Sequence, residues 1–120
     1  MDGGGEKKNA PETARLRLRF RLGEEADVTV TSCCGRILSF SINYRTFAFG
    51  SWRDVVRYDT AHGAVHVHKL WKEYGTGKPL GPACGDMNAA FKTAYEDIIA
   101  NWKNYRKRAA FELEKYKSGG

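Results

Sequence analysis

Cysteine, proline and histidine are all scarce in this chain, with three residues of each among 120. Three cysteines cannot pair completely, and the adjacent Cys33 and Cys34 have poor geometry for a structural disulfide, which argues against a disulfide-stabilised secreted domain. No apolar run approaches the ~20 residues that a membrane-spanning helix needs. The Gly-rich, charged residues 1–11 lack the apolar centre of a signal peptide. These absences predict a protein of the reducing cytoplasm that does not contact a membrane.

The composition is that of one globular domain with an excess of positive charge. Hydrophobic residues make up 42% of the chain, which is enough to build a core. Lysine and arginine number 20 against 14 acidic residues, which gives a net charge of +6. Such an excess favours a polyanionic partner, either RNA or an acidic protein.

Strict alternation of apolar and polar residues predicts most of the fold. Residues 1–13 show no periodicity and are interpreted as a disordered tail before a single domain over residues 14–118. From Arg15 to Leu22, arginine alternates with apolar residues, which is typical of a strand with one buried face. Four more strands are predicted over residues 27–31, 38–44, 53–59 and 64–71, with a bend or bulge near Gly50. Together they predict an antiparallel meander.

A long helix is predicted at the C-terminal end of the domain. Asp86 is a good N-cap, and apolar residues then recur at helical spacing to about Tyr116, including Trp102 and Tyr105 as core residues. Such a helix is ~45 Å long, so it should overhang the sheet with a basic second half or break between Asn101 and Asn104. The predicted fold class is α+β, with about five antiparallel strands and one C-terminal helix packed on one face. The basic overhang favours an acidic partner or a homodimer.

An arginine row is the first candidate for contact with nucleic acid. The alternation of the first strand places four arginines on one face, and Arg53 begins the fourth strand. An alternative is that arginines on an edge strand only discourage aggregation. The candidate RNA-binding residues are Arg15, Arg17, Arg19, Arg21 and Arg53.

All three histidines fall within one predicted hairpin, residues 57–69. A turn centred on Ala61 and His62 would place Asp59 opposite Ala64, Arg57 opposite His66 and Val55 opposite His68. The polar face of this hairpin would then gather two imidazoles, a guanidinium and a carboxylate, with His62 at the rim.

These residue types suit RNA cleavage without a metal cofactor. Imidazoles exchange protons near pH 7, and a guanidinium binds phosphate and stabilises the charge of a phosphoryl transition state. In this hypothesis His66 and His68 transfer protons, Arg57 stabilises the phosphorane and Asp59 orients an imidazole, with His62 and Lys69 as secondary candidates. Two alternatives stay open: a zinc or nickel site at His62, His66 and His68, and a non-catalytic nucleic-acid- or protein-binding module with solvated histidines.

The same segment resembles a known family. The run from Arg57 to His62, followed by His66, His68 and Lys69, resembles the Arg-Tyr-Asp-Asn-Ala…His…His-Lys-His pattern of TumE-family toxins. Thr60 stands where that pattern has Asn, and Val67 separates the paired histidines. The resemblance implies a small RNA-directed toxin that a cognate antitoxin neutralises.

Overall fold

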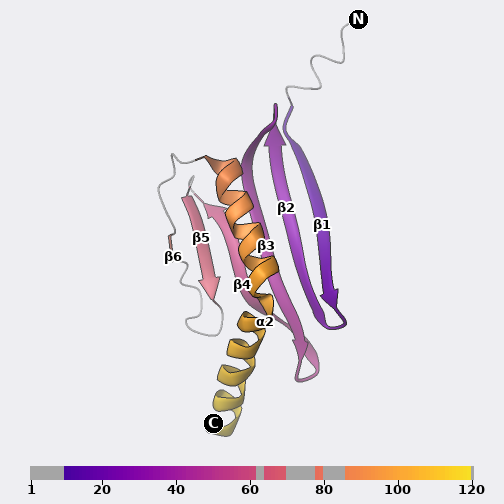
Figure 1. Cartoon of the computed structure of the whole chain (residues 1–120), viewed down its shortest axis with the longest axis vertical. Coiled ribbons are helices and arrows are strands. Elements are labelled where there is room, and N and C mark those ends of the chain that lie inside the picture. The colour runs from indigo at the N-terminus through magenta and orange to yellow at the C-terminus, as the bar shows by residue number, and fades with distance from the viewer. Residues whose placement is uncertain (1–9, 62–63, 70–77, 80–85, 120) are drawn as a thin grey trace, which may run out of the picture.

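The sheet follows the order of the chain, and each strand is antiparallel to the next (Figure 1). The computed structural model describes residues 10–61, 64–69, 78–79 and 86–119, except the side chains of residues 61, 78, 79 and 116–119. The strands are β1 (Glu12–Arg21), β2 (Glu24–Cys33), β3 (Arg36–Ala48), β4 (Ser51–Ala61), β5 (Ala64–Lys69) and the two-residue β6 (Lys78–Pro79). The helix α2 spans Met87–Gly119. The predicted α+β fold is therefore confirmed.

Two of the hairpin turns require residues with positive φ. Cys34 and Gly35 have φ of 57° and 79°, and Phe49 and Gly50 have φ of 53° and 83°. Two successive positive φ values match the type I′ turn, whose twist suits the right-handed twist of paired strands. The prediction of a bend or bulge at Gly50 is therefore wrong, because this glycine closes the turn between β3 and β4.

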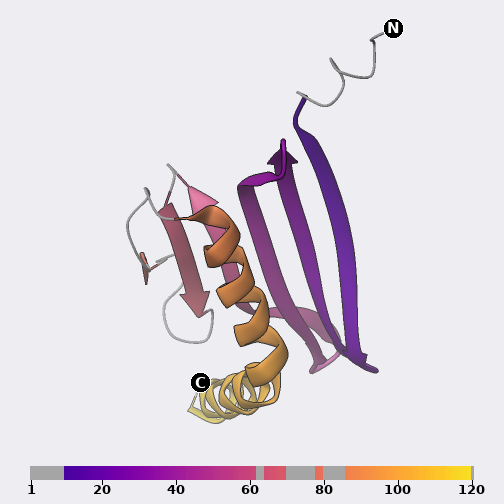
Figure 2. The same ribbon diagram turned by 45° about the horizontal axis from the view of Figure 1, so that its top comes forward.

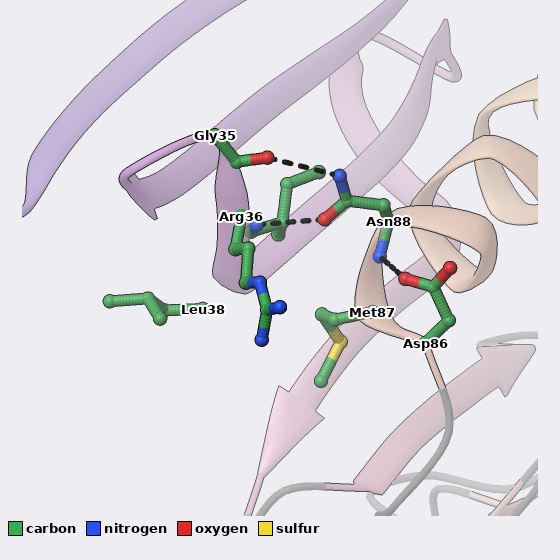
Figure 3. A pocket seen from close by; sticks show the side chains of 7 residues that line it. Gly35, Arg36, Leu38, Asp86, Met87 and Asn88 are labelled. Carbon is green, nitrogen blue, oxygen red and sulfur yellow. Dashed lines mark hydrogen bonds between the residues drawn. The ribbon is translucent and has the colours of Figure 1, made fainter.

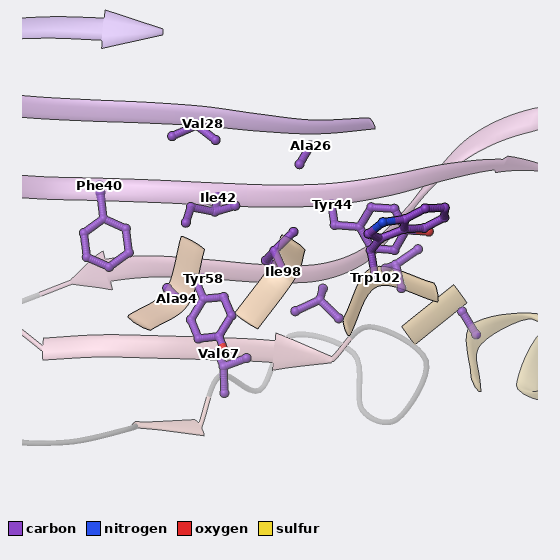
Figure 4. Close-up of a cluster of buried hydrophobic side chains, with 13 residues drawn as sticks. Ala26, Val28, Phe40, Ile42, Tyr44, Tyr58, Val67, Ala94, Ile98 and Trp102 are labelled. Carbon is purple, nitrogen blue, oxygen red and sulfur yellow. The ribbon is translucent and has the colours of Figure 1, made fainter. Parts of the chain in front are cut away.

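The helix packs on one face of the sheet, mainly over β3 and then β4 (Figure 2). Ile42 and Tyr44 from β3 and Ile98 from the helix are fully buried between the two layers (Figure 4). Val56 of β4 is fully buried as well. Trp102 adds its ring at a centroid distance of 5.0 Å from Phe20 and 6.2 Å from Tyr44. Its predicted place in the core is confirmed, and apolar burial of this kind is the main stabilising contribution to the fold.

The start of α2 is tied to the turn between β2 and β3 (Figure 3). Asp86 accepts a hydrogen bond from the backbone N of Asn88 at 3.0 Å, which confirms it as the N-cap. The side chain of Asn88 accepts from Ile37 N at 2.8 Å and donates to the carbonyl of Gly35 at 3.3 Å. These two bonds fix where the helix enters the sheet.

The helix continues without a break through Asn101–Asn104, so of the two predicted alternatives the overhang is the one observed. Its 33 residues span ~50 Å, whereas the 13 residues of β3 span ~43 Å. Figure 1 shows the C-terminal turns extending beyond the strands. Within the described residues, no helix is long and apolar enough to cross a membrane.

Two β-bulges change which residues face the helix. The register shifts between Arg19 and Arg21, so Phe20 and Arg21 both turn toward α2, where the Arg21 guanidinium lies 5.3 Å from the Trp102 ring centroid. A second shift beside Tyr44 leaves Val55 and Val56 both buried. The prediction that Arg21 shares a face with the other arginines is therefore wrong, and so is the predicted placement of Val55 opposite His68 on the polar side of the hairpin.

Candidate functional site

The face of the sheet opposite α2, here called the open face, carries polar side chains in rows that run across the strands. Because side chains alternate along each strand, the register determines which residues share a row. Three rows are Arg19, Glu25, Arg45 and Asp54; Arg17, Asp27, Asn43, Arg57 and His68; and Arg15, Thr29, Ser41, Asp59 and His66.

The histidine hairpin lies on this face with a register two residues away from the predicted one. Arg57 pairs with His68, Asp59 pairs with His66, and Ala61 pairs with Ala64. The pairing of β4 with β5 is centred one residue later in the chain than predicted. Each residue of β4 therefore pairs with a residue of β5 two positions further along. An even shift leaves the faces unchanged, so the imidazoles, the guanidinium and the carboxylate still share the open face.

Asp59 is the centre of this cluster. Its Oδ2 lies 3.4 Å from Nε of Arg57 and 3.4 Å from Nε2 of His68. The side chain of His68 is 15% exposed, whereas that of Arg57 is 41% exposed. A shared carboxylate therefore holds a largely buried imidazole and a solvent-accessible guanidinium on the same face.

His68 is poorly placed to touch a substrate. Its Nε2 faces Asp59, and its Nδ1 is buried with no hydrogen-bond partner among the described residues. His66, directly across from Asp59, is only partly buried. Both imidazoles are partly buried, and they differ in that the Nε2 of His68 lies against Asp59 while its Nδ1 is buried.

The secondary candidates do not join the cluster. Lys69 pairs with the buried Val56, so the register places it on the face that carries α2, not on the open face. His62 lies outside the described residues, as do residues 70 and 71 of the predicted fifth strand. The metal alternative required His62, and the described residues contain no group of three or more histidine, cysteine, aspartate or glutamate side chains that could hold an ion.

The arginine row lies on the open face but at the other side of the sheet. Three strand spacings, ~14 Å, separate β1 from β4. The Nε of Arg17 lies 2.8 Å from a carboxylate oxygen of Asp27 and 3.5 Å from one of Glu25. A guanidinium nitrogen of Arg19 lies 3.3 Å from the other carboxylate oxygen of Glu25. Because β2 supplies these acids, the open face has interleaved charges and is not the strongly cationic surface that the arginine row alone predicts.

Arg53 does not belong to the open face. Its Nε donates to the carbonyl oxygen of Ala48 at 3.0 Å, and its guanidinium lies 5.7 Å from the ring centroid of Phe49. Its strand partner is Thr46, which is buried on the side of α2. Arg53 therefore stabilises the end of the β3–β4 hairpin.

The open face also carries residues that the sequence interpretation did not single out. Arg45 reaches Glu25 at 3.6 Å and Asp27 at 3.7 Å, and its guanidinium lies 5.1 Å from the ring centroid of Trp52. Asn43 donates to Asp54 at 3.1 Å. The sequence does indicate where Arg45 lies. The predicted strand ends at Tyr44, but the alternation of side chains between the two faces continues through Arg45 and Phe47.

The tyrosine of the histidine motif faces the helix instead. Tyr58 donates to Asp97 Oδ2 at 2.7 Å, and Tyr105 donates to the same oxygen at 2.6 Å. Asn101 donates to the other carboxylate oxygen at 2.8 Å. Burial, and then the hydrogen bonds to Asp97, raise the pKa of both tyrosines above their ordinary value of about 10. This network joins β4 to α2 and gives Tyr58 a structural role.

Comparison with known families shows which family the chain belongs to but does not show its activity. Residues 9–115 match the family described as Domain of unknown function (DUF7718). The chain belongs to this family. No curated protein and no solved structure matches it. The resemblance to TumE-family toxins, with its RNA target and antitoxin, therefore stays a prediction.

Proposed function

We propose that the open face binds RNA and that the cluster around Asp59 cleaves it by acid–base chemistry without a metal. The observation that carries this proposal is the shared Oδ2 of Asp59, 3.4 Å from both Arg57 Nε and His68 Nε2. This ion pair keeps the guanidinium beside the carboxylate on the open face, and a cation held near phosphorus stabilises the charge that develops there. Its 41% exposure leaves it accessible to a phosphate.

The surroundings of each side chain support a division of roles. His68 has its Nε2 against Asp59 and its Nδ1 buried, so His66 transfers the proton and the 41% exposed Arg57 contacts the phosphate. Asp59 and the largely buried His68 are positioning residues that hold the guanidinium in place.

The proposed reaction is an internal transesterification of RNA. His66 accepts the proton of the 2′-hydroxyl as the 2′-oxygen attacks phosphorus, and the bond to the 5′-oxygen breaks. The 5′-oxygen leaves with a proton from the imidazolium or from water. The products are a 2′,3′-cyclic phosphate and a 5′-hydroxyl, and general acid–base catalysis of this kind contributes about 10²- to 10⁴-fold in rate.

One observation favours a second candidate, a non-catalytic RNA-binding module. The Nδ1 of His68 is buried and its Nε2 lies against Asp59, so this ring is poorly placed to serve as a second proton-transfer group. In this alternative the protein binds RNA, and its affinity depends on Arg57 but not on His66.

The deciding experiment measures cleavage of a labelled RNA by purified protein with and without a strong chelator, with detection of cyclic phosphate ends. We expect cleavage to persist in chelator and to fall at least about 100-fold in His66→Ala and in Arg57→Ala. Arg108→Ala, an exposed cation of α2, is the matched control and should cleave normally. Binding without cleavage by the wild type supports the module, and loss of cleavage in chelator supports the metal alternative.

A further inference from the structure

We propose that Phe47 and Trp52 form a base-stacking platform that selects unpaired RNA for the open face. This inference rests on the proposed RNA-directed function and names the form of the substrate. Phe47 and Trp52 pair across the β3–β4 hairpin, with ring centroids 5.6 Å apart and planes at 75°. They are 51% and 40% exposed, which leaves ring surface available to a base.

The register places both rings on the open face rather than under the helix. Phe47 follows Arg45 by two residues, so the two side chains share a face. The contact between the Arg45 guanidinium and the Trp52 ring, at 5.1 Å, agrees with this placement. Arg45 also lies within ion-pair distance of Glu25 and Asp27, so Trp52 lies against a cation that the open face itself pairs.

The core does not account for these exposed rings. The core has its own aromatic cluster on the opposite face, where Phe20, Tyr44 and Trp102 pack together. An aromatic cross-strand pair does stabilise a hairpin, but that contribution requires no exposed ring surface. Exposed aromatic rings beside arginine are the combination with which proteins bind single-stranded nucleic acid, because every base offers a π-face.

The platform and the Asp59 cluster lie on one line along the strands. Phe47 and Asn43 are four residues apart on β3, ~13 Å, and Asn43 is directly opposite Arg57. One strand of RNA can therefore stack a base at the hairpin and present a phosphate to Arg57.

The charges of the open face point to stacking as the main source of affinity. Its three rows contain five arginines and four carboxylates, so attraction to a polyanion is weak. The bases of a duplex are stacked on each other and cannot use an aromatic side chain, whereas unpaired bases can. The platform therefore selects single-stranded over double-stranded RNA.

The test measures binding by fluorescence anisotropy of a labelled, unstructured 12-nucleotide RNA and of the same RNA in a duplex. All proteins carry His66→Ala, so that cleavage does not interfere. We expect the single strand to bind at least tenfold more tightly than the duplex, and Phe47→Ala/Trp52→Ala to weaken single-strand binding roughly 10- to 100-fold. Trp52→Phe, which keeps a ring, should bind within about threefold of the parent.

Phe111→Ala is the matched control, because Phe111 is an aromatic residue of α2 with 59% exposure. It should bind like the parent, and circular dichroism should show that every variant is folded. Equal binding of single strand and duplex, unchanged affinity in the double variant, or a wild-type dimer that the double variant converts to a monomer would each overturn the platform. Binding that depends on Phe47 and Trp52, with no cleavage by the wild type, would retain the platform and remove the catalytic proposal.

Discussion

At the scale of single residues, two β-bulges turn Arg21 toward α2 and bury Val55, whereas strict alternation would place both side chains on the open face. The alternating run of β1 places Arg21 with the other arginines, yet the bulge turns it onto the ring of Trp102. A bulge inserts one extra residue into a strand, and the alternation of β1 shows no interruption at this point. Around Val55 the signal was visible, because two successive apolar residues interrupt the alternation of β4.

Tyr58 provides a test at this scale through its dependence on pH. Its pKa is raised in the folded protein, so the folded state keeps the proton at a pH where the unfolded chain loses it. The stabilisation is fully present below pH ~10 and is lost as the pH rises above it, by about 1.4 kcal/mol per pH unit. Tyr58→Phe should therefore lower the free energy of unfolding by about 2 kcal/mol at pH 7 but flatten its decline between pH 10 and 11.

The measurement is urea denaturation of both proteins from pH 7 to pH 11. Tyr95→Phe is the control, because Tyr95 lies on α2 and its ring packs against Phe91, whereas the described hydrogen bonds to Asp97 come from Tyr58, Tyr105 and Asn101. Parallel curves for the wild type and Tyr58→Phe above pH 10 would show that Tyr58 does not hold its proton more tightly in the folded state.

At the scale of the elements, the helix is positioned by polar contacts at its start and middle and by the apolar residues that it packs into the core. The N-cap and the bonds from Asn88 to the β2–β3 turn fix its start, and Asp97 fixes its middle to β4. The N-cap was predictable because its pattern is local, whereas the bonds from Asn88 join residues more than 50 positions apart. A single sequence does not reveal such a pairing.

The helix start can be tested by two substitutions that remove different contacts. Asp86→Ala removes the N-cap and should cost about 1 kcal/mol of unfolding free energy. Asn88→Ala removes two bonds to the β2–β3 turn and should cost about 1–2 kcal/mol. Asn104→Ala, at an exposed position of α2, should change stability by less than about 0.5 kcal/mol, as urea denaturation will show. Equal stabilities for Asn88→Ala and Asn104→Ala would contradict a clamp at the helix start.

The β3–β4 turn offers a stabilising substitution. Phe49 has φ of 53°, a conformation in which residues other than Gly, Asn and Asp are uncommon, and it precedes Gly50 at 83°. Asn-Gly is the preferred pair for a type I′ turn, so Phe49→Asn should raise the free energy of unfolding by about 0.5 kcal/mol. Gly50→Ala should lower it by about 1–2 kcal/mol, although no atom lies within 4 Å of the added Cβ. Thermal unfolding of both variants checks the opposite signs.

At the scale of the whole molecule, the chain has a mixed-charge sheet face and a basic helix on opposite sides. Period-two alternation predicted the strands and their faces, and helical spacing predicted α2. The same patterns did not predict that β2 would bring Glu25 and Asp27 beside the arginines of β1 and Arg45 of β3. The surface charge depends on strand order, which period-two patterns leave open. The candidate site was therefore predicted in its residues better than in its electrostatic surroundings.

This charge distribution gives a prediction that distinguishes the two sides of the molecule. If RNA lies on the open face, the protein contacts no more than about three of its phosphates. A plot of the logarithm of affinity against the logarithm of salt concentration should then have a slope shallower than about −2. Charge reversal at Lys107 and Arg108, which are exposed on α2, should then weaken binding less than threefold at 150 mM salt. At this salt concentration, exposed charges more than ~8 Å apart are largely screened from each other. Arg57→Glu should weaken binding more than tenfold. A steep slope together with strong dependence on Lys107 and Arg108 would place the RNA on the helix and leave the open face without this role.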